Sequence, residues 1–209
     1  MFILGHVGIG SRLGALVPGA GTAKVAPWLL FGTLLPDLID KPLYYGLAFA
    51  SDARGADLGL ISCTRTIGHS ALFAVFLWLV LAATGRRRAG LALFVGMATH
   101  WVLDFGGDAA GFLFFRAGLA SRPLGWSSLR ALVFPLAGRH FAVMPFHTVK
   151  DHLRGLGQIY TIAGELVGGA LLLMSRRSAR MLPLDEATKT NAPHADGLPP
   201  AEPFAKSPR

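Results

Sequence analysis

The chain has 209 residues, of which 52% are hydrophobic and 15% are charged, whereas soluble domains carry about 25% charged residues. This composition excludes an ordinary soluble domain and, with a mean hydropathy of +0.48, indicates a helical membrane protein. The net charge of +8 is concentrated in short arginine clusters at the ends of apolar runs. That layout marks cytoplasmic membrane flanks and argues against a nucleic-acid partner.

Two apolar segments near the N-terminus predict the first membrane-embedded helices. Residues 2–18 contain His6 and Arg12, and residues 24–36 end at Pro36. A proline inside a helical pattern usually ends or kinks the helix. We therefore expect the second helix to stop at Pro36, just before two aspartates.

The clearest membrane span is residues 66–85, which contain no Asp, Glu, Lys or Arg and match the roughly 20 residues that a bilayer crossing requires. The cluster Arg86–Arg88 follows at once, and a shorter apolar segment, 89–103, then ends at Asp104. These features predict a helical hairpin whose turn carries the three arginines.

The remainder of the chain divides into three parts. Residues 109–137 contain apolar pieces separated by arginines and predict re-entrant or interfacial helices, whereas 157–175 is a final span broken only by Glu165. The polar, proline-rich residues 182–209 predict a disordered cytoplasmic tail. The chain is thus expected to be an all-α, polytopic membrane protein with about five membrane-embedded helices plus short interfacial helices, in one domain over residues 1–181.

Six ionisable side chains fall at one depth of this topology. When the positive-inside rule places the arginine clusters in the cytoplasm, the opposite ends of four helices carry His6, Asp37, Asp40, His69, His100 and Asp104. In the hairpin, residue 69 lies opposite residue 104, and His100 and Asp104 are neighbours on one helical face. The six side chains are therefore expected to meet.

These side chains have the chemistry of a metal site. Ionisable groups at the centre of a membrane segment cost roughly 2.5–3.5 kcal/mol on insertion scales, so they usually pair or bind something. Imidazole nitrogen with carboxylate oxygen suits zinc, and also manganese or iron, while the single Cys63 excludes a cysteine-rich site. In a simpler alternative, Asp37 ends one helix and Asp40 is the N-cap of the next segment.

Four stretches together resemble the YdjM-like, or LexA-binding, family of inner-membrane-associated metal-dependent hydrolases: GHVGIG, GTLLPDLID, RTIGHSALF and GMATHWVLD. The resemblance covers about residues 1–105 and is weaker at 124–146. It implies a bacterial inner-membrane protein with the metal ligands His6, Asp37, His69, His100 and Asp104. The family's usual D-x-D spacing is changed here, which makes Asp37 a better ligand than Asp40.

A more distant likeness to zinc-dependent phospholipase C and P1-type nucleases rests on His-x-x-x-Asp pairs. One such pair is HWVLD, with His100 and Asp104, and another is HTVKD, with His147 and Asp151. This likeness implies that His147 and Asp151 are additional, weaker ligands.

The resemblance and the location imply a membrane-bound metal-dependent hydrolase, with zinc as the expected cofactor and the site on the extracytoplasmic side. A site at the bilayer surface suits a phosphoesterase, whose expected partners are membrane lipids and a small phosphoester or lipid substrate. Asp40 would act as a general base or orient a histidine. Arg65 would clamp a phosphate oxygen or anchor its helix at the interface.

Two other classes of function stay open. A non-catalytic metal- or proton-binding protein, acting in ion transport or as a scaffold, is favoured by Glu165 within the final span. A protein-binding membrane anchor would use the basic tail.

Overall fold

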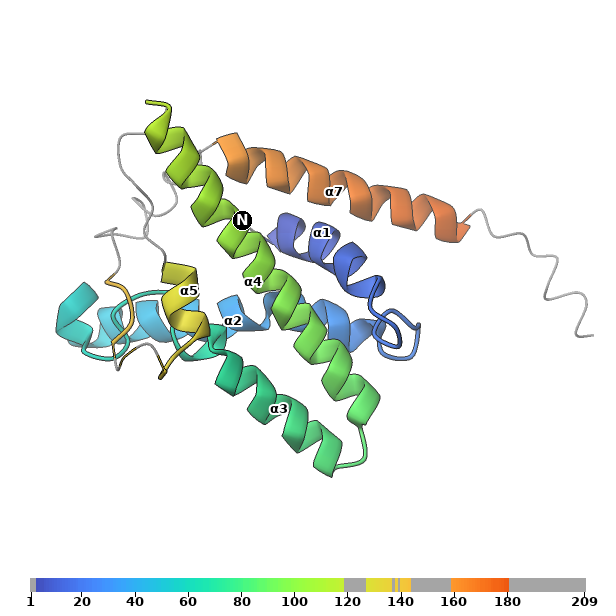
Figure 1. Cartoon of the computed structure of the whole chain (residues 1–209), viewed down its shortest axis with the longest axis horizontal. Helices are drawn as coiled ribbons and strands as arrows, with labels where there is room; N and C mark the ends of the chain where they lie inside the picture. The colour runs from blue at the N-terminus through green and yellow to red at the C-terminus, as the bar shows by residue number, and fades with distance from the viewer. Residues whose placement is uncertain (1–2, 119–126, 137, 139, 144–158, 181–209) are drawn as a thin grey trace, which may run out of the picture. The chain divides into compact units, whose positions relative to one another are not determined.

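The computed structural model describes residues 3–118, 127–136, 138, 140–143 and 159–180. The predictions for His147, Asp151 and the tail lie outside these residues. The chain divides into a compact unit, Met1–Met174, and a second unit, Ser175–Arg209. All described elements are helical (Figure 1). They are α1 (Ile3–Ala15), α2 (Ala26–Ser51), η1 (Gly55–Leu58), η2 (Ile67–His69), α3 (Ala71–Ala83), α4 (Arg87–Arg116), α5 (Ser127–Leu132) and α7 (Ile159–Arg180).

The second helix does not stop at Pro36, so that expectation was wrong. Helix α2 continues to Ser51 with Pro36 and Pro42 inside it, and ends where Asp52 adopts a left-handed conformation, with φ of 52°. Pro36 lacks an N–H group, but it is buried among neighbouring helices, whose packing offsets the lost hydrogen bond. Asp37 and Asp40 therefore lie on a continuous helix, and neither ends or caps one.

The fourth helix also runs further than expected. Helix α4 passes through Asp104 and ends at Arg116, so the break after residue 103 and the separate interfacial helix from residue 109 were wrong. The carboxylates of Asp104 and Asp108 are both paired with Arg65. Because both carboxylates have this cationic partner, neither residue needs to leave the helix to be hydrated by water.

Among the described residues, α4 is long and apolar enough to cross a membrane, whereas α3 and Tyr160–Ser175 are apolar but shorter. Helix α3 is hydrophobic all round: Ala74 is its buried residue, while Leu72 and Phe76 are 60% and 58% exposed. Such a surface suits contact with lipid tails. About five membrane-embedded helices remain a prediction.

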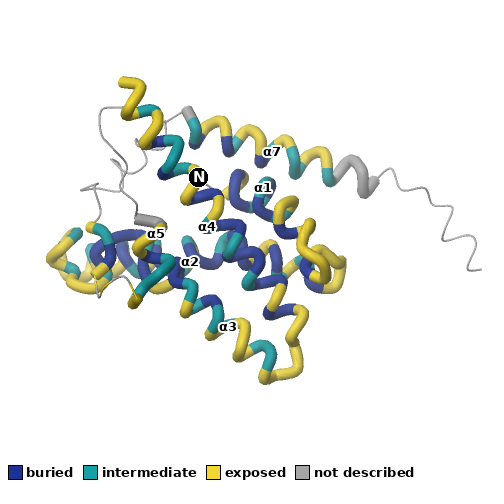
Figure 2. Tube along the Cα trace, viewed as in Figure 1, coloured by how far each residue is buried: buried dark blue, intermediate teal, exposed yellow. Residues whose placement is uncertain are grey.

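Glycines allow two close helix crossings that position the site. A Cβ atom on Gly32 of α2 would lie 2.3 Å from the Leu93 carbonyl oxygen of α4, and one on Gly96 would lie 2.3 Å from that of Leu29. A Cβ atom on Gly8 of α1 would likewise lie 2.1 Å from the Gly168 carbonyl oxygen of α7. Small residues let helix backbones approach closely in membranes. Figure 2 shows that buried residues concentrate where α1, α2 and α4 meet.

Candidate metal centre

Two histidine rings bring their Nε2 atoms together at the centre of the site. His69 in η2 donates its Nδ1–H to Asp40 Oδ2, and His100 in α4 donates its Nδ1–H to the Thr33 carbonyl oxygen, both at 2.7 Å. Both partners are acceptors, so each neutral ring carries its lone pair on Nε2. The two Nε2 atoms lie 3.2 Å apart. In two neutral rings these lone pairs repel each other, and a shared cation, either a metal ion or a proton, would relieve the repulsion.

Carboxylate oxygens flank the two Nε2 atoms. Asp104 Oδ2 lies 3.5 Å from His69 Nε2 and 3.7 Å from His100 Nε2. Asp37 Oδ1 lies 3.8 Å and 4.0 Å from the same two atoms. Zinc–ligand distances of about 2.0–2.2 Å place the ligands of a tetrahedral site about 3.3–3.6 Å apart. Two triads, Asp37–His69–His100 and His6–His100–Asp104, each bring their ligand atoms close enough together to hold a divalent cation.

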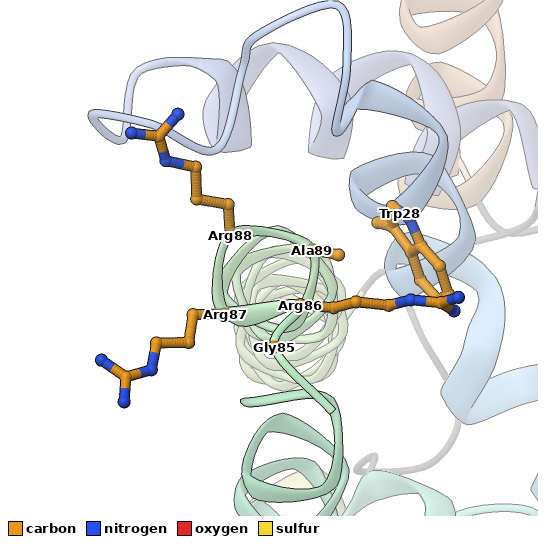
Figure 3. A pocket seen from close by; sticks show the side chains of 6 residues that line it. All are labelled: Trp28, Gly85, Arg86, Arg87, Arg88 and Ala89. Carbon is orange, nitrogen blue, oxygen red and sulfur yellow. The ribbon is translucent and has the colours of Figure 1, made fainter. Parts of the chain in front are cut away.

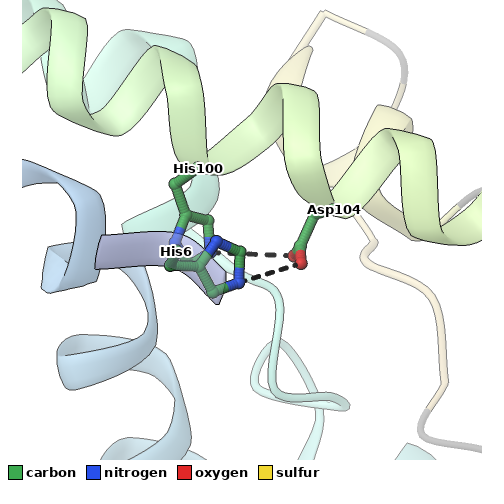
Figure 4. Close-up of side chains that lie close together, drawn as sticks. All are labelled: His6, His100 and Asp104. Atoms are coloured by element: carbon green, nitrogen blue, oxygen red, sulfur yellow. Dashed lines mark ion pairs between the residues drawn. The ribbon is translucent and has the colours of Figure 1, made fainter. Parts of the chain in front are cut away.

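His6 extends the cluster toward α1. Its ring stacks on that of His100, with centroids 3.9 Å apart and planes inclined by 12° (Figure 4). The ring is fully buried, and neither of its nitrogens forms a hydrogen bond with the described residues. Leaving such a group unsatisfied costs about 1–3 kcal/mol, which a coordinated cation would offset.

Asp104 is placed to serve two binding positions. Its Oδ2 faces His69 and His100, while its Oδ1 lies 3.5 Å from His6 Nε2 (Figure 4). A carboxylate that presents separate oxygens to separate histidines has the geometry of a bridging ligand. The arrangement can therefore accommodate one cation or an adjacent pair.

Asp40 holds the η2 turn in place. This contact is what the predicted role of orienting a histidine requires. The carboxylate is fully buried. It accepts hydrogen bonds from the backbone N–H groups of Thr66, Gly68 and His69, from the Thr66 hydroxyl and from His69 Nδ1. Both of its oxygens are thus occupied by donors that fix the His69 ring and leave its Nε2 facing the other ligands.

Arg65 pairs with two acids on α4 and offsets one of their two negative charges. Its Nε lies 2.9 Å from Asp104 Oδ2 and its Nη1 lies 2.8 Å from Asp108 Oδ1. The Cys63 thiol, whose pKa burial raises to about 11, donates to the Arg65 carbonyl oxygen. The sequence predicts a place for Arg65 near the site, and the structure adds its two carboxylate partners.

The charges of the cluster fit a divalent cation. Asp37 forms an ion pair with Lys41, one helical turn further along α2. Four carboxylates (Asp37, Asp40, Asp104 and Asp108) then surround two cationic side chains (Lys41 and Arg65). With neutral histidines, this leaves a net charge of −2 in a largely buried region, which a divalent cation would neutralise.

One functional group was not foreseen. The carbonyl oxygen of Thr33 orients His100, and a backbone group carries no sequence signal. Asp108, by contrast, lies four residues after Asp104, and this spacing alone could have indicated a shared partner. All five predicted metal ligands converge in the structure, and Asp40 and Arg65 lie directly beside them.

Glu165 has a structural role at the N-terminus of α1. Its carboxylate oxygens accept the backbone N–H groups of Leu4 and Gly5, both at 3.0 Å. These N–H groups belong to the first turn of a helix, where they have no partner within the helix. The contact fixes α1, and with it His6, against α7.

The fold and the cluster define an all-helical protein, within the described residues, that has a buried histidine–aspartate centre. The chain belongs to the family of YdjM inner membrane proteins, because the model of that family matches residues 1–174. No curated protein and no solved structure matches the chain. The distant likeness to phospholipase C and P1-type nucleases therefore gains no support from these comparisons.

Proposed function

We propose that this protein is a membrane-bound metal-dependent hydrolase, acting as a phosphoesterase on a lipid-derived or membrane-proximal substrate. The observation that carries the proposal is the pair of His69 and His100 Nε2 atoms, 3.2 Å apart and flanked by the Asp104 carboxylate. Zinc suits these ligands best, with manganese and iron as alternatives.

In this proposal His69, His100, Asp104 and Asp37 would hold the cation, and His6 would be a further ligand beside Asp104. The bound metal would supply Lewis-acid chemistry and activated water for hydrolysis. Asp40 keeps His69 in the tautomer that presents Nε2. Arg65, whose side chain is 24% exposed, offers guanidinium donors to a phosphate oxygen while it balances the charge of Asp104.

The location of the cluster supports a membrane-proximal substrate. From Arg87 to His100, the rise of an α-helix amounts to about 20 Å, compared with a hydrocarbon core about 30 Å thick. The positive-inside rule places Arg86–Arg88 on the cytoplasmic side. The cluster would then lie toward the extracytoplasmic half of a multi-pass inner-membrane protein.

The first test is the metal content of detergent-purified protein by plasma mass spectrometry. We expect one or two zinc or manganese ions per chain, lost in the variant H100A/D104A. The variant H140A/D57A is the matched control, because it removes the same residue types at exposed positions. Absence of metal from the wild type after supplementation, or equal metal in both variants, would refute the proposed centre.

A non-catalytic metal-binding role is the second candidate, because His6, His69 and His100 are each at most 1% exposed. Such burial suits a structural ion as well as a reacting one. Metal-loaded protein that hydrolyses none of a panel of phospholipids and soluble phosphoesters would favour it. Ion transport is less well supported, since the best polar group for it, Glu165, serves α1.

A further inference from the structure

A cationic surface lies where α3 turns into α4. Arg86, Arg87 and Arg88 are exposed there and, with Trp28 from α2, line a hollow of about 480 Å³ (Figure 3). Within the described residues, none of the three guanidinium groups forms an ion pair. These three positive charges on consecutive residues are therefore available to an anionic partner.

The side chains spread outward and do not converge on one point. In Figure 3, α4 is seen end-on; Arg86 extends beside Trp28, while Arg87 and Arg88 project away from it in other directions. Three arginine side chains that extend in different directions around the axis of α4 can each bind a separate phosphate group, and these phosphates would lie in a plane perpendicular to the helix. A site for a single small anion would instead need side chains that converge on one point.

The residues around the three arginines favour a membrane surface as the source of these phosphate groups. Helix α3, which leads directly into the arginines, exposes Leu79 by 53% and Val80 by 44%, and α4 is long enough to span a bilayer. Tryptophan is enriched at the boundary between hydrocarbon and headgroups. Trp28 is half-buried, packing its ring against the core while it lines the hollow.

We propose that Arg86, Arg87, Arg88 and Trp28 form a binding surface for anionic phospholipid headgroups. Guanidinium groups bind phosphate oxygens in pairs of hydrogen bonds, and the hollow beside Trp28 leaves room for the glycerol of a headgroup. The surface is separate from the histidine–aspartate cluster and does not depend on the reaction or ligand of that cluster.

The test is a lipid titration of the full-length protein in detergent, followed by native mass spectrometry. We expect dioleoyl phosphatidylglycerol to be retained in preference to dioleoyl phosphatidylcholine. An arginine near an anionic surface contributes about fivefold to binding. The variant R86Q/R87Q/R88Q is therefore expected to lower the phosphatidylglycerol affinity on the order of a hundredfold.

The control variant R54Q/R116Q/R130Q removes the same charge from exposed positions elsewhere and should retain the lipid preference. Equal loss in both variants would show a bulk charge effect and overturn the proposal, as would equal binding of the two lipids. Inorganic phosphate at millimolar concentration should not displace phosphatidylglycerol. Full displacement would show that the site takes free phosphate and not a headgroup.

Discussion

Substitution of Asp40 tests whether the η2 turn and His69 are held by one buried carboxylate. Asp40→Ala removes the acceptor of five hydrogen bonds between 2.6 and 3.2 Å. A hydrogen bond to a charged group contributes about 1.5–3 kcal/mol, but bonds that share one acceptor do not add. Loss of one partner from a buried charged pair costs about 3–5 kcal/mol, and we expect a loss of that size in the free energy of unfolding.

Asp40→Asn should be milder. Its amide nitrogen can face the Thr66 hydroxyl, which is able to accept as well as donate, so that the bond from the Gly68 N–H group is the main one lost. We expect a cost of about 1–3 kcal/mol for that unsatisfied donor and the missing charge. Because His69 would then be oriented by a neutral group, zinc affinity should fall about 10–100-fold.

The assay is reversible unfolding in detergent with a chelator present, followed by competition for zinc with a chromophoric chelator. Asp57→Asn, at an exposed position, is the control and should change neither quantity. If Asp40→Ala stays within about 1 kcal/mol of the wild type, the hydrogen-bond network does not hold the turn and the reasoning is refuted.

Three further predictions concern the supports of the site. Gly96→Ala places a Cβ atom 2.3 Å from the Leu29 carbonyl oxygen and should lower the free energy of unfolding in detergent by about 1–3 kcal/mol. Gly46→Ala, which has open space around it, is the control and should be neutral or stabilising. Equal effects of the two substitutions would contradict the close crossing of α2 and α4. Glu165→Ala should lower the free energy of unfolding by about 0.5–2 kcal/mol through the lost α1 contact but leave the metal held by His69, His100 and Asp37 in place, and abolished metal binding would contradict this purely structural role. The Cys63 thiol, whose pKa burial raises to about 11, stays protonated at pH 8 and should react with iodoacetamide far more slowly in folded than in denatured protein; equal rates would show that it is accessible.

The helical class and the convergence of the ligands could be predicted without the structure. Apolar runs and arginine clusters indicate a helical membrane protein, and the hairpin turn at Arg86–Arg88 correctly places residue 69 opposite residue 104, since His69 Nε2 and Asp104 Oδ2 lie 3.5 Å apart. The helix ends were harder to predict. Pro36 and Asp104 are both stop signals locally, but tertiary packing and the Arg65 ion pairs override them.

The sequence alone therefore determined the kind of protein and the set of polar side chains that are expected to meet, because an ionisable group within an apolar membrane segment is costly unless it has a partner. The tertiary structure decided the role of each side chain. Asp37 and Asp40 are three residues apart on α2, yet one presents an oxygen to the histidines and the other is enclosed by the η2 turn. That difference depends on which backbone N–H groups surround each carboxylate, and only the folded chain brings those groups together.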